Sequence, residues 1–111
     1  MKHPVVLGAA LMLVATAASA QTAPADPAVG LTAAKRWCAD CHVIAGDQRG
    51  AGPDAAPTWT SLMRDPAVTP GGLRQFLLAP HRGMPNLQLS RQDIDDIVAY
   101  MLTLRSSGGG P

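Results

Sequence analysis

Two cysteines and a histidine stand together in the stretch RWCADCHV, where Cys38 and Cys41 are separated by two residues and His42 follows directly. The chain contains no other cysteine. Thiols and an imidazole at this spacing fit four kinds of site: a structural disulfide, a thioredoxin-like redox dithiol, a zinc site and covalent attachment of a haem. The rest of the sequence must be weighed against each of them.

Three of the four readings match the sequence poorly. A disulfide that closes so short a loop removes little entropy from the unfolded chain. A redox dithiol is expected at a strand-to-helix turn of an α/β fold, and no strand-like alternation is visible. Structural zinc takes four ligands, and His81 and the Asp residues form no recognisable second pair.

Covalent haem attachment has C-x-x-C-H as its signature. Residues three apart on a helix lie on the same side, so Cys38 and Cys41 can add to the two vinyl groups of one porphyrin. His42 then reaches beneath the porphyrin plane, where its Nε2 binds iron. We therefore expect one covalent haem c. We also expect it to be needed for folding, because two Trp, one Tyr and one Phe offer little aromatic bulk for a core.

The second axial position of the iron determines the function. A protein ligand there favours electron transfer, and an open position permits oxygen or peroxide chemistry. Met63 and Met101 fall at apolar positions of predicted helices, where Met is commonly packing filler. Met84 lies in the loop sequence GMP, where no packing face calls for a large apolar side chain. We favour Met84, because a Met/His pair suits an electron-transfer haem, with His81 as the rival.

The first residues and the charge balance restrict where the protein acts. VVLGAALMLVATAASA ends in a small-x-small site, which predicts that residues 1–20 are a secretory signal peptide cleaved after Ala20. Its roughly sixteen apolar and small residues fall short of the roughly 20 that span a bilayer. Without Lys2, eight basic residues balance eight Asp, and no basic stripe indicates nucleic acid. We expect a periplasmic monomer with no stable membrane span after cleavage and no nucleic-acid partner.

Helical segments must position the motif. The sequence predicts helices over about 29–41, 58–65, 70–79 and 90–104, joined by loops rich in Gly and Pro. Residues 21–28 read as a flexible leader and 106–111 as a flexible tail.

Local signals support the last two helices. Thr69 followed by Pro70 is a favoured N-terminus, and Ser90 followed by Asp93 resembles a capping box. Two sets of apolar residues are each expected to share one helix face: Leu73, Phe76 and Leu77 in the third helix, and Ile94, Ile97, Val98, Met101 and Leu104 in the fourth.

Together these features resemble the class I c-type cytochromes, especially the small single-haem bacterial ones. CADCH stands near the start of the exported chain, GMP follows about forty residues later, and an amphipathic helix closes the domain. The resemblance covers roughly residues 29–104. It implies an all-α domain over 29–105, with three to five helices and long loops around one covalent haem. It also implies His42 and Met84 as the axial ligands.

Other positions match or depart from that family. Gly30 matches the small residue that lets the first and last helices cross closely, and Tyr100 matches its aromatic partner region. Ala34 stands where an aromatic residue is common, with Trp37 nearby to compensate.

The surroundings of the haem are less sharply specified. The proline whose carbonyl accepts a hydrogen bond from the ligand histidine is Pro53 or Pro57, and the Gly-Pro context favours Pro53. The candidates to meet the haem propionates are Trp59, Arg49, Arg74 and Arg82.

The leading hypothesis is a periplasmic monohaem electron carrier, not an enzyme, that meets redox proteins transiently. Two alternatives stay open at this point. One is a haem subunit of a larger dehydrogenase. The other is a haem catalyst or gas sensor with a labile sixth ligand.

Overall fold

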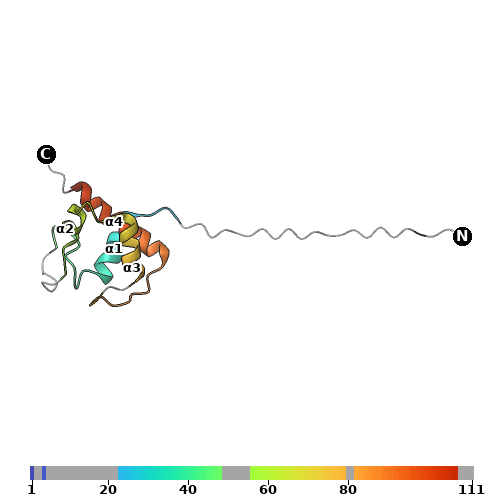
Figure 1. Ribbon diagram of the computed structural model, residues 1–111, viewed down its shortest axis with the longest axis horizontal. Helices are drawn as coiled ribbons and strands as arrows, with labels where there is room; N and C mark the ends of the chain where they lie inside the picture. The colour runs from blue at the N-terminus through green and yellow to red at the C-terminus, as the bar shows by residue number, and fades with distance from the viewer. Residues whose placement is uncertain (2–3, 5–22, 49–55, 80–81, 108–111) are drawn as a thin grey trace.

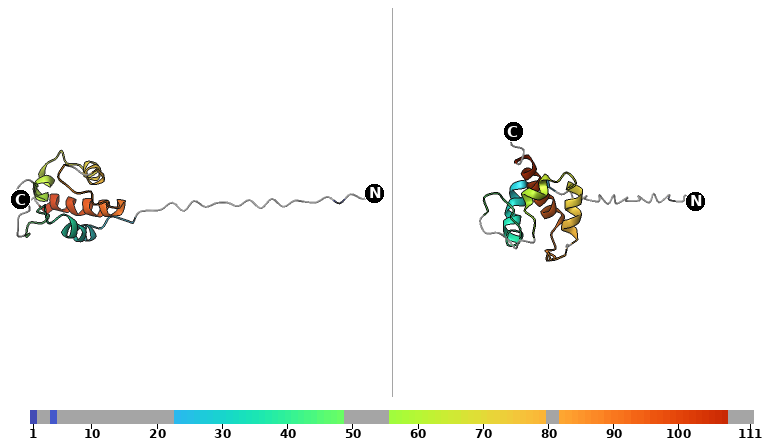
Figure 2. Two further views of the ribbon diagram at one scale, coloured as in Figure 1. Left: turned by 90° about the horizontal axis from the view of Figure 1, so that it is seen from below. Right: turned by 60° about the vertical axis from the view of Figure 1, so that its left-hand side comes forward.

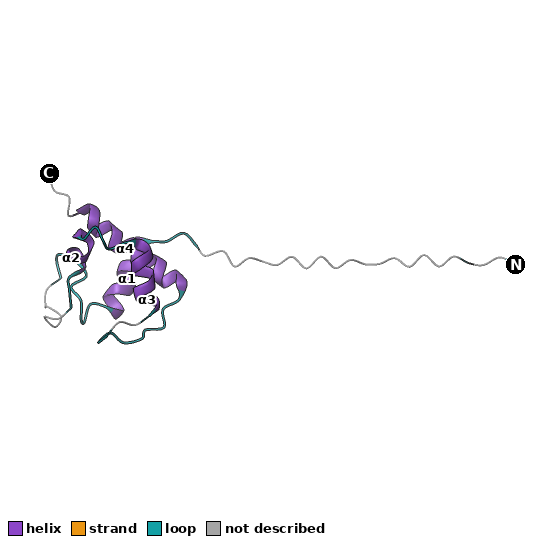
Figure 3. Ribbon diagram, in the orientation of Figure 1, coloured by secondary structure: helices purple, strands orange, loops and turns teal. Residues whose placement is uncertain are grey.

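The computed structural model describes residues 1, 4, 23–48, 56–79 and 82–107. Apart from residues 1 and 4, the predicted signal peptide lies outside these ranges, as do Arg49, Pro53 and His81. Within them the chain forms no strand, and none of its helices combines the length and apolar character of a membrane span. Four helices occupy the described part of the chain (Figures 1 and 3): α1 (Pro27–Trp37), α2 (Trp59–Arg64), α3 (Pro70–Leu78) and α4 (Arg91–Ser107).

The last helix, α4, is the centre of the domain. It contacts α1, α2 and α3, and Figure 2 shows it lying between α1 on one side and the α2 and α3 segments on the other. Its core face is the one that the apolar periodicity predicts, because Ile94, Ile97, Val98 and Met101 are all buried. The partly buried Leu104 packs against the same core.

A capping box starts α4, as predicted. The Ser90 hydroxyl accepts the Asp93 amide at 3.1 Å, and the Asp93 carboxylate accepts the Ser90 amide at 2.9 Å. Two amides that the helix itself cannot satisfy are therefore paired. The helix continues to Ser107, three residues beyond its predicted end.

The first helix is shifted toward the N-terminus relative to the prediction. Asp26 is its N-cap, accepting the Ala28 amide at 2.8 Å, and Pro27 occupies the first helical turn. Asp-Pro is an effective helix start because the carboxylate satisfies an unpaired amide and proline has none to satisfy. The last two residues of the predicted leader are therefore helical. At the other end the helix stops at Trp37, before the cysteine motif.

The backbones of α1 and α4 touch where they cross. A Cβ added to Gly30 would overlap the carbonyl group of Asp96, so only glycine permits this approach, as the sequence predicts. The buried carboxylate of Asp96 accepts the Asp26 amide at 2.8 Å and the Gln92 Nε2 at 3.0 Å. The start of α1 is thus tied to α4 by a close crossing and by hydrogen bonds.

In α3 the predicted apolar face is only partly correct. Leu73 is buried and Leu77 packs against the core, but Phe76 is 61 % exposed. At about 100° per residue, Phe76 lies about 60° to one side of Leu73 and Leu77 about 40° to the other. The core of the domain covers the Leu77 side.

The connection between α2 and α3 is held by α4. The Arg105 guanidinium donates to the Met63 carbonyl at 3.1 Å and to the Val68 carbonyl at 2.7 Å. Each of the two helices starts after a threonine N-cap. Thr69 is the N-cap that the sequence predicts, whereas Thr58, predicted as the first residue of its helix, is instead the N-cap.

Candidate functional site

The cysteine motif forms a turn directly after α1 instead of a continuation of that helix. The Cys38 amide donates to the Ala34 carbonyl at 2.9 Å, and the His42 amide donates to the Cys38 carbonyl at 2.8 Å. The second bond spans four residues, as in a helix, so the turn keeps Cys38 and His42 close. The thiols of Cys38 and Cys41 are both free; the first is buried and the second is exposed.

The protonation of Cys38 argues against a redox dithiol. Burial, and to a lesser degree the charge of Cys41, raises the pKa of the Cys38 thiol to about 11. Redox-active C-x-x-C sites depend on the opposite shift, which gives a reactive thiolate near neutral pH. Among the described residues, no three His, Cys, Asp or Glu side chains gather into a group that could hold a metal ion.

The imidazole of His42 is oriented by a backbone carbonyl. Its Nδ1 lies 3.3 Å from the Pro57 carbonyl oxygen. A carbonyl can only accept, so this bond places the proton on Nδ1 and leaves the lone pair of Nε2 available for a metal. The carbonyl belongs to Pro57, which is the less favoured of the two candidate prolines. This contact does not support the preference for Pro53, which lies outside the described residues.

Trp59 is buried beside the motif. Its ring centroid lies 6.1 Å from that of His42 and 6.1 Å from that of Tyr100. Its backbone amide donates to the Val43 carbonyl at 2.9 Å, which joins the start of α2 to the residue after the histidine. Trp59 therefore packs against the candidate iron ligand, and its predicted contact with a haem propionate stays a prediction.

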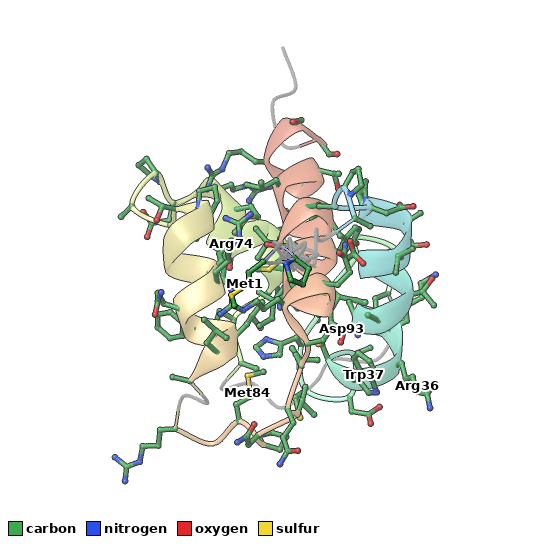
Figure 4. All side chains as sticks on the ribbon, turned by 90° about the vertical axis from the view of Figure 1, so that its right-hand side faces the viewer. Met1, Arg36, Trp37, Arg74, Met84 and Asp93 are labelled. Atoms are coloured by element: carbon green, nitrogen blue, oxygen red, sulfur yellow. The ribbon has the colours of Figure 1, made fainter. Side chains whose placement is uncertain are left out.

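The three methionines considered as the second ligand occupy different environments. Met63 and Met101 are buried in the apolar core, with 1 % and 4 % of their surfaces exposed. Met84 is half-buried on the loop that follows α3, and its side chain points from this loop toward the body of the domain (Figure 4). Gly83, just before it, has φ of +83°, a conformation that glycine adopts without strain.

The candidate propionate contacts are dispersed. Arg74 is already paired with Asp95, at 2.7 Å between Nε and Oδ1. Arg82 is exposed on the loop before Met84, and Arg49 lies outside the described residues.

Trp37 does not take the place of the missing aromatic residue. It is 39 % exposed at the end of α1, with the Arg36 guanidinium 5.8 Å from its ring centre (Figure 4). Ala34 is fully buried and packs in the core as a small residue. Ala34 is therefore covered by the core, whereas Trp37, three residues later at the end of α1, is partly exposed.

Sequence reasoning missed one residue of the site, Gln48. Its side chain bonds to the backbone of Ala39, His42 and Ile44, on both sides of the histidine. Gln48 lies in a segment without periodicity or motif, so the sequence carried no signal for this role.

These residues fit a covalently attached haem. Two free thiols and the candidate iron nitrogen lie in one short turn, and a thioether sulfur points inward from the loop after α3. Cys38 and Cys41 would hold the porphyrin, and His42 and Met84 offer a nitrogen and a sulfur of the kind that bind haem iron.

Comparison with known proteins identifies the family of the chain. The family model described as "Cytochrome C oxidase, cbb3-type, subunit III" matches residues 25–101. Cytochrome c-552 of Bradyrhizobium diazoefficiens is 42 % identical over 98 residues, which cover 88 % of this chain and 93 % of that protein. No solved structure matches the chain significantly. The chain therefore belongs to the cytochrome family of the cbb3-type oxidase subunit III and is a small class I c-type cytochrome, an all-α electron carrier with covalently bound haem c.

Proposed function

We propose that this cytochrome is a periplasmic carrier of single electrons whose haem iron is bound axially by His42 and Met84. When bound, haem supplies an iron that accepts and releases one electron. The protein contributes the two ligands, the attachment through Cys38 and Cys41, and the apolar surroundings that set the potential.

The observation that carries the proposal is the pairing of His42 Nδ1 with the Pro57 carbonyl at 3.3 Å. This bond fixes the tautomer and restricts rotation of the ring, which are the properties of a permanent iron ligand. A second ligand that is held equally firmly keeps both oxidation states in similar geometry.

Met84 is the best supported second ligand. Of the methionines in the described part of the chain after residue 23, Met63 and Met101 are packed in the core and Met84 is not. Gly83, with a positive φ, precedes Met84 directly, and the Met84 side chain points toward the body of the domain. A thioether ligand favours the ferrous iron and raises the potential, which suits an electron carrier.

A carbon monoxide titration of the reduced, haem-loaded protein tests this ligation. We expect the wild-type protein to resist carbon monoxide, because Met84 occupies the sixth position, and the Met84→Ala variant to bind it readily. Met101→Leu is the matched control, since it removes a core thioether and should leave the wild-type behaviour unchanged. Ready binding by the wild type contradicts Met84 ligation and favours the catalyst or gas-sensor alternative.

Export is the second part of the proposal. The predicted cleavage after Ala20 would deliver residues 21–111, with the haem domain over about 29–105, to the periplasm. We expect the haem-loaded protein in the periplasmic fraction with Gln21 as its first residue. A chain that lacks residues 1–20 should accumulate in the cytoplasm without haem. Haem-loaded protein in the cytoplasm would contradict export.

Membership of a larger complex is a second candidate, favoured by one observation. The family model that matches residues 25–101 is named for a subunit of an oxidase. Size-exclusion chromatography of a periplasmic extract under gentle conditions distinguishes a free carrier from a subunit of a complex. A free carrier elutes as a monomer of this small chain, and a subunit elutes with its complex.

A further inference from the structure

We propose that Gln48 is the positioning residue of His42. Its carboxamide holds the main chain on both sides of the histidine, and it thereby sets the direction in which the imidazole reaches the iron. This inference rests on the proposed function, because it takes His42 to be an axial ligand.

Three hydrogen bonds join Gln48 to the motif turn and the segment after it. Nε2 donates to the Ala39 carbonyl at 3.1 Å and to the His42 carbonyl at 3.0 Å, and Oε1 accepts the Ile44 amide at 2.8 Å. All three are partly buried. One side chain therefore bridges the interior of the C-x-x-C-H motif, the histidine itself and the second residue after it.

Only a glutamine satisfies these three partners. An amide nitrogen has two protons for the two carbonyls, and the amide oxygen accepts from the Ile44 amide. The types of the three partners leave no doubt about which end of the amide is the nitrogen. A glutamate would place a carboxylate oxygen against two carbonyl oxygens. An asparagine is one methylene too short to span the same partners.

The other contacts of this segment fix different parts of it. Pro57 bonds to the ring of His42, Trp59 to the Val43 carbonyl, and Tyr100 donates to the Ile44 carbonyl at 2.7 Å. In the described residues Gln48 alone bonds to the carbonyl of His42 itself.

The ring contact and the main-chain contact act on the same side chain. The Pro57 carbonyl restrains rotation of the imidazole, and Gln48 fixes the backbone from which that side chain extends. Losing the second restraint leaves the ring tethered at its tip but free to shift at its base. We therefore expect loss of Gln48 to disturb the iron–histidine bond before it disturbs the helices.

Two variants of the haem-loaded full chain test the role. Gln48→Met keeps the length and volume of the side chain and removes all three hydrogen bonds. Gln48→Glu keeps the acceptor for the Ile44 amide and loses both donors. The matched control is Gln92→Met, which removes another half-buried carboxamide bond, to Asp96, away from the motif.

The measurements are the hyperfine-shifted proton signals of the His42 imidazole in the ferric protein and the midpoint potential. We expect both Gln48 variants to retain covalent haem. We also expect them to give split or displaced imidazole signals and a midpoint potential moved from the wild-type value. Gln92→Met should reproduce the wild-type signals and potential even where it lowers the unfolding temperature.

The outcomes separate this inference from the proposed function. Wild-type signals in Gln48→Met, in a protein that shows histidine and methionine ligation, overturn the role of Gln48 alone. Absence of imidazole ligation in the wild type itself overturns the proposed function. Loss of covalent haem in both Gln48 variants while Gln92→Met keeps it would also overturn the role, because Gln48 would then be needed for haem attachment and not for the direction of the imidazole.

Discussion

At the scale of single residues, His42 shows how a five-residue motif depends on groups far away in sequence. The motif places an imidazole after two thiols, but Pro57 and Gln48 determine how that imidazole is held. Neither could be assigned from the motif. Proline carbonyls and loop glutamines are common, and which of them reaches the ring is decided by how the loop folds back.

Gly83 is a residue on which the Met84 loop depends. Its φ of +83° is unfavourable for any residue with a Cβ, so Gly83→Ala should cost about 1–2 kcal/mol or force the loop to another path. We expect the reduced variant to bind carbon monoxide faster than the wild type because Met84 is held less firmly. Gly46→Ala is the control, since a Cβ there meets nothing and Gly46 has no positive φ. Equal carbon monoxide rates in both variants would contradict this dependence.

Tyr100 gives a prediction about alkaline stability. Burial, and secondarily the charge of Asp47, raises the pKa of the Tyr100 phenol above its ordinary value of 10.0. The folded protein thus keeps this proton where the unfolded chain loses it. The resulting stability is fully present below pH 10 and is lost as pH rises above it.

The Tyr100→Phe variant tests whether ionisation of this phenol causes the loss of stability at high pH. At neutral pH it should be less stable by about 1–2 kcal/mol, because the Ile44 carbonyl loses its donor at 2.7 Å. Above pH 10 the difference from the wild type should shrink, since phenylalanine has no proton to lose. Urea unfolding of the two haem-loaded proteins, at neutral pH and above pH 10, measures their free energies of unfolding. A difference between the two proteins that grows with pH would contradict the raised pKa of Tyr100.

At the scale of elements, the crossing of α1 and α4 is the contact least tolerant of change. A methyl group on Gly30 overlaps the carbonyl of Asp96, so Gly30→Ala must push the two helices apart. We expect a loss of about 3 kcal/mol, at the upper end of overpacking effects. Denaturant unfolding of the haem-loaded protein measures it.

Gly71 in α3 provides the matched control for that substitution. A Cβ on Gly71 meets nothing within 4 Å, so Gly71→Ala should be neutral or should stabilise the helix by up to about 1 kcal/mol. The two variants make the same chemical change in two helices. A loss of stability in Gly71→Ala as large as that in Gly30→Ala would contradict the assignment of the effect to the close crossing.

The sequence predicts elements well where caps and periodicity agree. Ser90 with Asp93 and Thr69 with Pro70 locate helix starts correctly, because these signals act within one turn. The end of α1 was wrong, since nothing local distinguishes a helix from the motif turn that follows it. The face of Phe76 was also wrong, because the core covers only one side of the predicted stripe.

At the scale of the whole molecule, the described helices meet only through α4. It contacts α1, α2 and α3, and no contact joins α1 to α3 directly. The cysteine turn extends from the end of α1, and Met84 lies on the loop that follows α3. A haem attached to the cysteine turn and bound by Met84 would connect the α1 side of the domain to the α3 side. These two helices otherwise share only α4 as a neighbouring helix.

Removing the two cysteines that attach the haem should therefore destabilise the fold as well as remove the redox centre. We expect the Cys38→Ala, Cys41→Ala double variant to lose helix content and cooperative unfolding. Without haem, α1 and α3, from which the turn and the Met84 loop extend, share only α4 as a neighbouring helix, and a domain of this size has little other core to hold them. Circular dichroism and hydrogen exchange of the exported protein measure this, and α3 should exchange sooner than α4. A haem-free domain with native helix content and a sharp transition would show that packing around α4 is sufficient.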